Sequence, residues 1–199
     1  VFQDPDDQLF SASVKQDISF GPMNLGLPQT EVERRVRLAM EKTGVTEFCH
    51  KPTHNLSYGQ KKRVAIAGIL AMEPEVLILD EPTAGLDPMG VHEIMQLLVE
   101  TQEESGFSVV ISTHDIDIVP LFCDYVYVME QGQVVLEGTP EEVFANRTRL
   151  REVNLRLPRI GHLMEILKEK DGFLLEGNPT TIAEARKALK EWGQSCKKG

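Results

Sequence analysis

Two adjacent carboxylates, Asp80 and Glu81, directly follow the apolar segment Val76–Leu79. A short apolar run of this kind is typical of a strand that is buried on both faces of a parallel sheet. The carboxyl ends of such strands are where α/β sheets bind ligands. One carboxylate at that place can hold Mg²⁺ in phosphoryl transfer, and its neighbour can polarise an attacking water as a general base. By itself the pair also fits a solvated strand end, so the surrounding motifs are needed to tell a catalytic site from a surface position.

The segment Leu56–Gln60 reads Leu-Ser-Tyr-Gly-Gln and opens a predicted helix that runs to about Met72. A helix N-terminus presents backbone N–H groups and a partial positive charge, which suit an anion such as a phosphate. Ser57 adds a hydroxyl donor, and Gly59 lets the backbone approach a ligand closely. Taken alone, however, this segment is better explained as an ordinary serine N-cap.

The order and spacing of the motifs over residues 1–145 resemble the ATP-binding-cassette family. Leu56–Gln60 resembles its signature motif, Val76–Glu81 its Walker B strand with the catalytic glutamate, and Ala84–Asp87 its D-loop. His114 falls at the switch histidine, and Gln3 falls at the glutamine of the Q-loop. The resemblance implies an ATPase that uses Mg²⁺ and works as a pair of cassettes, homodimeric or heterodimeric, with ATP held between the two subunits.

The resemblance also implies a role for each matching residue. Glu81 would activate the attacking water and His114 would contact the γ-phosphate, which makes these two the catalytic residues. Gln3 and Asp80 would help to hold Mg²⁺. The implied nucleotide-binding residues are Gln3, Ser57, Tyr58, Gly59, Gln60, Asp80 and Asp87, with Asp87 touching the partner subunit.

The chain departs from the family pattern in two places. Tyr58 stands where the signature motif usually has glycine, so its ring must point away from the phosphate. No Gly-x-x-x-x-Gly-Lys-Ser/Thr segment occurs, although that loop cradles the phosphates and supplies a lysine. We therefore expect the Walker A portion to belong to a longer parent, and this chain alone to be inactive. We also expect the missing strand to leave an exposed apolar edge beside the Walker B strand.

Several segments resemble the ATPases of energy-coupling-factor importers, especially the cobalt/nickel type. They are Asp4–Phe10, Asp17–Pro22, Asn24–Leu27, Lys61–Gly68 and Leu155–Pro158. The implied function is ATP hydrolysis that energises uptake of a transition-metal ion. The implied location is peripheral, at the cytoplasmic face of the membrane. The implied partners are an integral membrane coupling subunit and a substrate-binding membrane subunit. Phe10, Phe20 and Met23 are candidates for the docking surface, with internal packing as the competing explanation.

Three other functions fit some of the same motifs. A vitamin-type importer ATPase would share them, because selectivity lies in a separate membrane subunit. A soluble, non-transport ATPase of the same family would not co-purify with an integral membrane protein. A regulatory half-cassette without enzymatic activity would tolerate Glu81→Gln. The net charge of −10 argues against a nucleic-acid partner, since little would neutralise phosphate backbones.

The alternation of apolar strands and helices predicts an α/β fold, an incomplete P-loop NTPase cassette with a mainly parallel sheet. We expect a partial cassette over residues 1–148, with a helical subdomain at about 4–73, and a helical extension over 149–199. Predicted helices cover Val14–Phe20, Thr30–Lys42, Pro88–Glu104, Asp115–Asp124, Pro140–Ala145, Arg159–Lys170 and Thr181–Trp192. Predicted strands are Phe107–Ser112 and a hairpin of Tyr125–Met129 with Gln133–Leu136.

The remaining polar residues receive structural explanations. Cys49, His50 and His54 could form a metal site, but a polar loop is the better explanation because no fourth ligand is suitably spaced. Three widely spaced cysteines, Cys49, Cys123 and Cys196, suggest no disulfide framework. Lys61–Arg63 is expected to be a solvated basic face.

Overall fold

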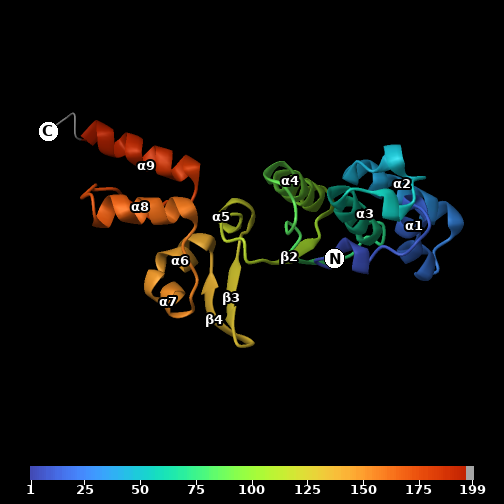
Figure 1. The fold of residues 1–199 in the computed structure, drawn as a ribbon, viewed down its shortest axis with the longest axis horizontal. Helices are drawn as coiled ribbons and strands as arrows, with labels where there is room; N and C mark the ends of the chain where they lie inside the picture. The colour runs from blue at the N-terminus through green and yellow to red at the C-terminus, as the bar shows by residue number, and fades with distance from the viewer. Residues whose placement is uncertain (196–199) are drawn as a thin grey trace. The chain divides into compact units, whose positions relative to one another are not determined.

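The computed structural model describes residues 1–195, so Cys196 lies outside the described residues. The chain divides after His114 into two compact units, which are described separately below. The first unit contains both helices and strands, as expected for an α/β cassette (Figure 1). The boundary predicted from the sequence at residue 148 falls inside the second unit. The division into a cassette and an extension therefore stays a prediction.

Three helices form the helical part of the first unit: α1 (Val14–Asn24), α2 (Gln29–Thr43) and α3 (Tyr58–Leu70). Short 3-10 turns lie before and between them, at η1 (Pro5–Asp7), η2 (Thr46–Phe48) and η3 (Thr53–Asn55). The helices pack through branched apolar side chains that exclude water almost completely. These include Val14, Ile18, Val36, Val64 and Ile66.

Two boundaries in this part differ from the sequence predictions. The predicted helix Val14–Phe20 ends too early, because α1 continues through Gly21 and Pro22 to Asn24. Gly21 lies close to Met72: a Cβ at this position would lie 2.7 Å from side-chain atoms of Met72, which would have to shift. The helix predicted over Thr30–Lys42 begins one residue earlier, since α2 starts at Gln29 after Pro28 and has no side-chain cap.

The strand β1 (Val76–Asp80) pairs in parallel with β2 (Ser108–Ser112), and α4 (Pro88–Ser105) connects them. Leu77 and Leu79 are buried, but Val76 and Ile78 are 52% and 63% exposed. The prediction that this strand is buried on both faces is therefore wrong for the described residues, because they cover only one face of it.

The second edge of β1 is paired at its carboxyl end. The Val1 amine donates to the Ile78 carbonyl at 2.7 Å, and the Asp80 amide donates to the Val1 carbonyl at 2.9 Å. The open edge expected beside the Walker B strand is thus partly closed by residue 1.

The second unit begins with α5 (Val119–Phe122), which is much shorter than the helix predicted over 115–124. The predicted hairpin is confirmed as β3 (Val126–Glu130) paired antiparallel with β4 (Gln133–Gly138). Its turn residues Gln131 and Gly132 both have positive φ, of 49° and 79°, as hairpin turns of the primed types require.

Four helices follow the hairpin: α6 (Pro140–Ala145), α7 (Arg147–Glu152), α8 (Arg159–Glu169) and α9 (Ile182–Ser195). The predicted helix Pro140–Ala145 is confirmed with its capping box. Trp192 packs on Phe173 with ring centroids 4.4 Å apart, which holds α9 in this unit as expected.

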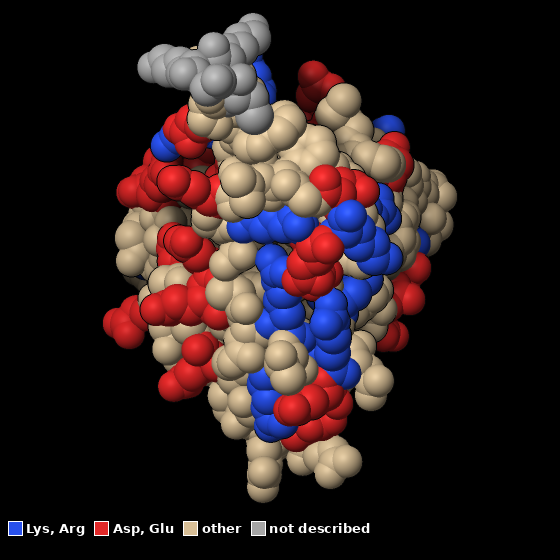
Figure 2. Space-filling view, turned by 90° about the vertical axis from the view of Figure 1, so that its left-hand side faces the viewer, with Lys and Arg blue, Asp and Glu red and all other residues tan. Residues whose placement is uncertain are grey.

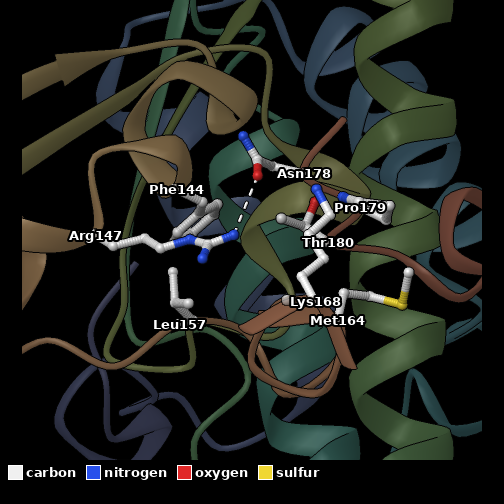
Figure 3. A pocket seen from close by; sticks show the side chains of 9 residues that line it. Phe144, Arg147, Leu157, Met164, Lys168, Asn178, Pro179 and Thr180 are labelled. Carbon is white, nitrogen blue, oxygen red and sulfur yellow. Dashed lines mark hydrogen bonds between the residues drawn. The ribbon is translucent and has the colours of Figure 1, made fainter. Parts of the chain in front are cut away.

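Figure 2 shows a band of Lys and Arg side chains interleaved with Asp and Glu. In the second unit the buried Glu165 carboxylate accepts from Arg151 at 2.6 Å and from Arg147 at 3.4 Å. Arg147 also donates to the Asn178 side chain at 3.1 Å, beside a small pocket lined by apolar residues such as Met164 (Figure 3). These cations serve mainly to balance carboxylates on neighbouring helices.

Candidate nucleotide-hydrolysis site

The carboxyl ends of β1 and β2 lie side by side and bring polar side chains together. Asp80 pairs in register with Ser112, whose hydroxyl donates to Asp80 Oδ1 at 2.5 Å. Asp80 is exposed at this edge, as expected for a residue that meets a ligand beyond the strand end. The sequence analysis did not anticipate the contact with Ser112.

Glu81 and His114, the two predicted catalytic residues, are in direct contact. Glu81 Oε1 accepts from the His114 backbone N–H at 2.9 Å and lies 2.7 Å from His114 Nδ1. Thr113 Oγ1 donates to Glu81 Oε2 at 3.3 Å. A carboxylate can only accept, so Nδ1 carries the hydrogen in this contact. The imidazole orientation is thereby coupled to the position of the carboxylate.

The backbone of Glu81 is unusual. Its φ is +44°, in the left-handed region that non-glycine residues seldom occupy. Its amide donates to the Ser112 carbonyl at 2.9 Å, which fixes the residue to the end of β2. This turn directs the side chain toward His114 instead of continuing the strand.

Gln3, Tyr58 and Asp80 line one open hollow, together with Phe2, Asp4 and Asp7. Gln3 and Asp80, the predicted magnesium-binding residues, therefore line the same hollow. One carboxylate and one amide oxygen are hard donors that fit Mg²⁺, which commonly takes one or two carboxylates plus water and phosphate oxygens. Among residues 1–195, no three His, Cys, Asp or Glu side chains gather as a metal site, and that includes the loop with Cys49, His50 and His54.

The N-terminus of α3 is closed by a reciprocal capping box. Gln60 N–H donates to Ser57 Oγ at 3.3 Å, and Ser57 N–H donates to Gln60 Oε1 at 3.0 Å. Within the described part of the chain, no hydrogen-bond acceptor lies against the N–H groups of Tyr58 and Gly59. The first turn of α3 can thus present two amides to an anion while both side-chain caps remain in place.

The loop between β1 and α4 packs against this helix end. A Cβ on Gly85, whose φ is +76°, would lie 2.9 Å from Cε1 of the Tyr58 ring. The ring therefore lies over Gly85, which gives it a place away from the anion-facing amides. Asp87, predicted to touch a partner subunit, caps α4 by accepting from the Gly90 N–H at 2.7 Å.

Lys62 was assigned to a solvated face, and this prediction is wrong. Its relative exposure is 0%, and burial lowers the pKa of its ammonium below the ordinary value of 10.5. Nζ donates to the backbone carbonyls of Gln3 at 2.6 Å and of Glu81 at 3.2 Å. The sequence offered one indication that Lys62 is buried, its position two residues after the signature motif. The run Lys61–Arg63, however, does not show which of its three side chains points into the protein.

The parallel strand pair, the capped anion-facing helix and the Glu81–His114 contact define the class of nucleotide-hydrolysing cassette proteins. A family model described as "ABC transporter" matches residues 1–84. A second model, described as "AAA domain, putative AbiEii toxin, Type IV TA system", matches residues 52–119.

Among curated relatives, the energy-coupling factor transporter ATP-binding protein EcfA2 of Clostridium perfringens is 65% identical over 192 residues, which are 96% of this chain and 67% of that protein. The solved structure of cbiO1 from Clostridium perfringens, described as part of the ABC transporter complex cbiONQ, matches with a TM-score of 0.70 and 67% identity. It covers 83% of this chain and 66% of the other. The dimeric post-hydrolysis structure of the ATP-binding cassette MJ0796, bound to ADP and Pi, matches with a TM-score of 0.60 and 28% identity over 70% of this chain and 62% of that one.

The chain belongs to the ATP-binding-cassette ATPases of energy-coupling-factor transporters. It spans about two thirds of the length of these relatives. Among residues 1–195, no helix has both the length and the apolar character that crossing a bilayer requires.

Proposed function

We propose that these residues supply the hydrolytic and partner-facing portion of a cassette that hydrolyses ATP to drive import. The contact of Glu81 with His114 at the end of β1 carries this proposal. It joins a carboxylate able to accept a proton from water to an imidazole able to meet a phosphate. A phosphate-binding loop, which this sequence does not contain, would complete the site in the intact protein.

In this proposal Glu81 Oε2 accepts the proton of the attacking water. Oε1 is held by two contacts of 2.9 and 2.7 Å from His114, whereas Oε2 has the longer contact of 3.3 Å from Thr113. Oε2 is therefore the oxygen whose hydrogen bond is more easily exchanged for one from water. When bound between Asp80 and Gln3, Mg²⁺ would supply charge neutralisation for the phosphates.

We further propose that the α3 N-terminus completes the nucleotide site of a second cassette. The unpaired amides of Tyr58 and Gly59, with the Ser57 hydroxyl beside them, suit a γ-phosphate that the partner subunit holds. The dimeric structure of MJ0796 with ADP and Pi supports pairing of such cassettes. Whether the pair is homodimeric or heterodimeric is left open by this proposal.

The proposed docking surface for a membrane subunit is the Phe10–Phe20–Met23 patch. These side chains are 66%, 47% and 59% exposed, and the two rings meet edge to face at 4.7 Å. Exposure of three large apolar residues together favours a partner over internal packing. Transition-metal import is the proposed substrate class, supported by the segments that resemble the cobalt/nickel type of importer ATPase. The proposed location is peripheral, at the cytoplasmic face of a membrane.

The experiment is phosphate release by the intact protein, with His114→Ala as the test and His92→Ala as the matched control on the exposed face of α4. We expect His114→Ala to lower kcat by about 10²-fold or more and His92→Ala to leave it unchanged. Equal rates in both variants would contradict the proposed site.

Association with the membrane is tested separately, by co-purification with integral membrane proteins. Phe20→Asp is expected to abolish the association, and Leu121→Asp, at another exposed apolar position, is expected to preserve it. A wild-type protein that hydrolyses ATP but retains no integral membrane protein would favour the soluble ATPase alternative.

A further inference from the structure

Lys62 is a buried cation that makes its hydrogen bonds to main-chain oxygens. Its Nζ donates to the carbonyl of Gln3 at 2.6 Å and to that of Glu81 at 3.2 Å. Nζ also lies 5.7 Å from the centroid of the Tyr58 ring. Burying an ammonium group away from water costs free energy. The hydrogen bonds of Lys62 to the two carbonyls must therefore offset that cost.

Tyr58 contacts the same backbone from the preceding turn of α3. Its hydroxyl donates to the Gln3 carbonyl at 3.3 Å, and its ring lies over Gly85. Tyr58 and Lys62 are four residues apart, so they lie on one face of the helix. From that face they contact the Gln3 turn, the end of β1 and the loop that leads to α4.

The contact with Glu81 acts on a strained residue. A non-glycine residue with φ of +44° stays in that conformation only when its surroundings hold it there. The Glu81 amide is held by the Ser112 carbonyl at 2.9 Å, and its own carbonyl is held by Lys62. Lys62 thus fixes one of the two peptide planes that set the direction of the Glu81 carboxylate.

We propose that Lys62 and Tyr58 are positioning residues that couple the anion-facing end of α3 to Gln3 and Glu81 within the same subunit. A displacement of the helix end, such as binding of a phosphate across a dimer would cause, then moves the water-activating carboxylate and the magnesium-binding turn together. This inference rests on the proposed function for the roles of Gln3 and Glu81. The coupling itself is a property of this chain.

The first test is amide hydrogen exchange on the 199-residue chain. Lys62→Met keeps most of the unbranched apolar stem, one atom shorter, and removes the ammonium donors. We expect exchange at the amides of Asp80 and Glu81 to accelerate by about tenfold, because the backbone of Glu81 is no longer held. Lys61→Met is the matched control, since Lys61 Nζ pairs with the Asp6 side chain at 2.5 Å and does not contact this backbone.

Tyr58→Phe is the second variant, and it removes only a hydroxyl from a partly exposed ring. If Lys62→Met does not fold, exchange at the Phe2 amide, which donates to Gln8 Oε1 at 3.1 Å beside the Gln3 carbonyl, decides the question in Tyr58→Phe, with an increase of about threefold expected. Unchanged exchange in the variant that is measured, or equal changes in Lys61→Met, would overturn the proposal.

The second test is steady-state hydrolysis by the intact protein. Lys62→Met should lower kcat by about tenfold and change KM for ATP by less than about twofold, because it misplaces a catalytic group without removing a ligand contact. A parallel loss in KM would indicate a merely structural effect and overturn the positioning role. If the wild-type protein hydrolyses no ATP, the proposed function fails, and the exchange experiment still decides whether the coupling exists.

Discussion

Replacing the Glu81 carboxylate by an amide is the sharpest test of the site. Glu81→Gln preserves the shape of the side chain. The amide oxygen can still face the His114 backbone N–H at 2.9 Å and Nδ1 at 2.7 Å, whereas the amide nitrogen would donate to the Thr113 hydroxyl instead of accepting from it at 3.3 Å. The substitution weakens the contacts because a charged acceptor becomes neutral, and charge-assisted hydrogen bonds are about twice as strong as neutral ones. With a net contribution of about 1 kcal/mol for an ordinary hydrogen bond, weakening the two His114 contacts should lower the free energy of unfolding by about 2 kcal/mol.

The catalytic effect should be much larger than the effect on stability. Removing a general base costs about 10²- to 10⁴-fold in rate. The assay is phosphate release by the intact protein at saturating Mg·ATP, with nucleotide affinity measured in parallel. Glu100→Gln, an exposed change of the same chemistry on α4, serves as the control. Hydrolysis within a few-fold of wild type would refute the assignment of Glu81, and a loss confined to nucleotide affinity would mean that Glu81 binds ATP without activating water.

Three further changes test packing, titration and capping. Ile66→Ala should destabilise the first unit by about 2–5 kcal/mol in urea unfolding, because it empties a fully buried site; a loss below about 1 kcal/mol would contradict this packing. Burial lowers the pKa of Lys62 below 10.5, so the unfolded chain binds more protons in that window and stability should rise with pH there. Lys62→Met should reduce the rise of the unfolding free energy with pH. The measurement is made below pH 10, because the raised pKa of Tyr58 makes stability fall with pH above that value. An unchanged slope in the variant would assign the titration to other groups. Thr139→Ala should cost about 1 kcal/mol by removing the α6 cap, and an unchanged urea midpoint would show that the cap is redundant.

Local signals in the sequence predicted the elements that frame the site. The apolar run before Asp80, the serine and glutamine around the start of α3 and the proline after Asp87 each act within a few residues. The structure accordingly places a strand, a capped helix and a second capped helix at these positions. The resemblance implied a role for Glu81 and a role for His114 but no contact between them, and the pairing of β1 with β2 brings them together.

The features that could not be predicted depend on packing between distant segments. Gly21 and Pro22 form a strong turn signal, yet α1 passes through them, and Met72 packs close to Gly21. Lys62 is chemically like its neighbour Lys61, and only the arrival of Gln3 and Glu81 beside α3 distinguishes the buried lysine from the surface one. Such assignments need the tertiary structure.

The backbone of Glu81 also bears on how this position can change. Glycine would adopt its φ of +44° without the cost of about 1–2 kcal/mol that a side chain incurs in the left-handed region. Selection for stability alone would therefore tend to replace this residue by glycine and remove the carboxylate at the same time. Position 81 is then a point of trade-off between stability and activity. A library of variants sorted for thermal resistance should be enriched in glycine here, and one sorted for hydrolysis should retain glutamate.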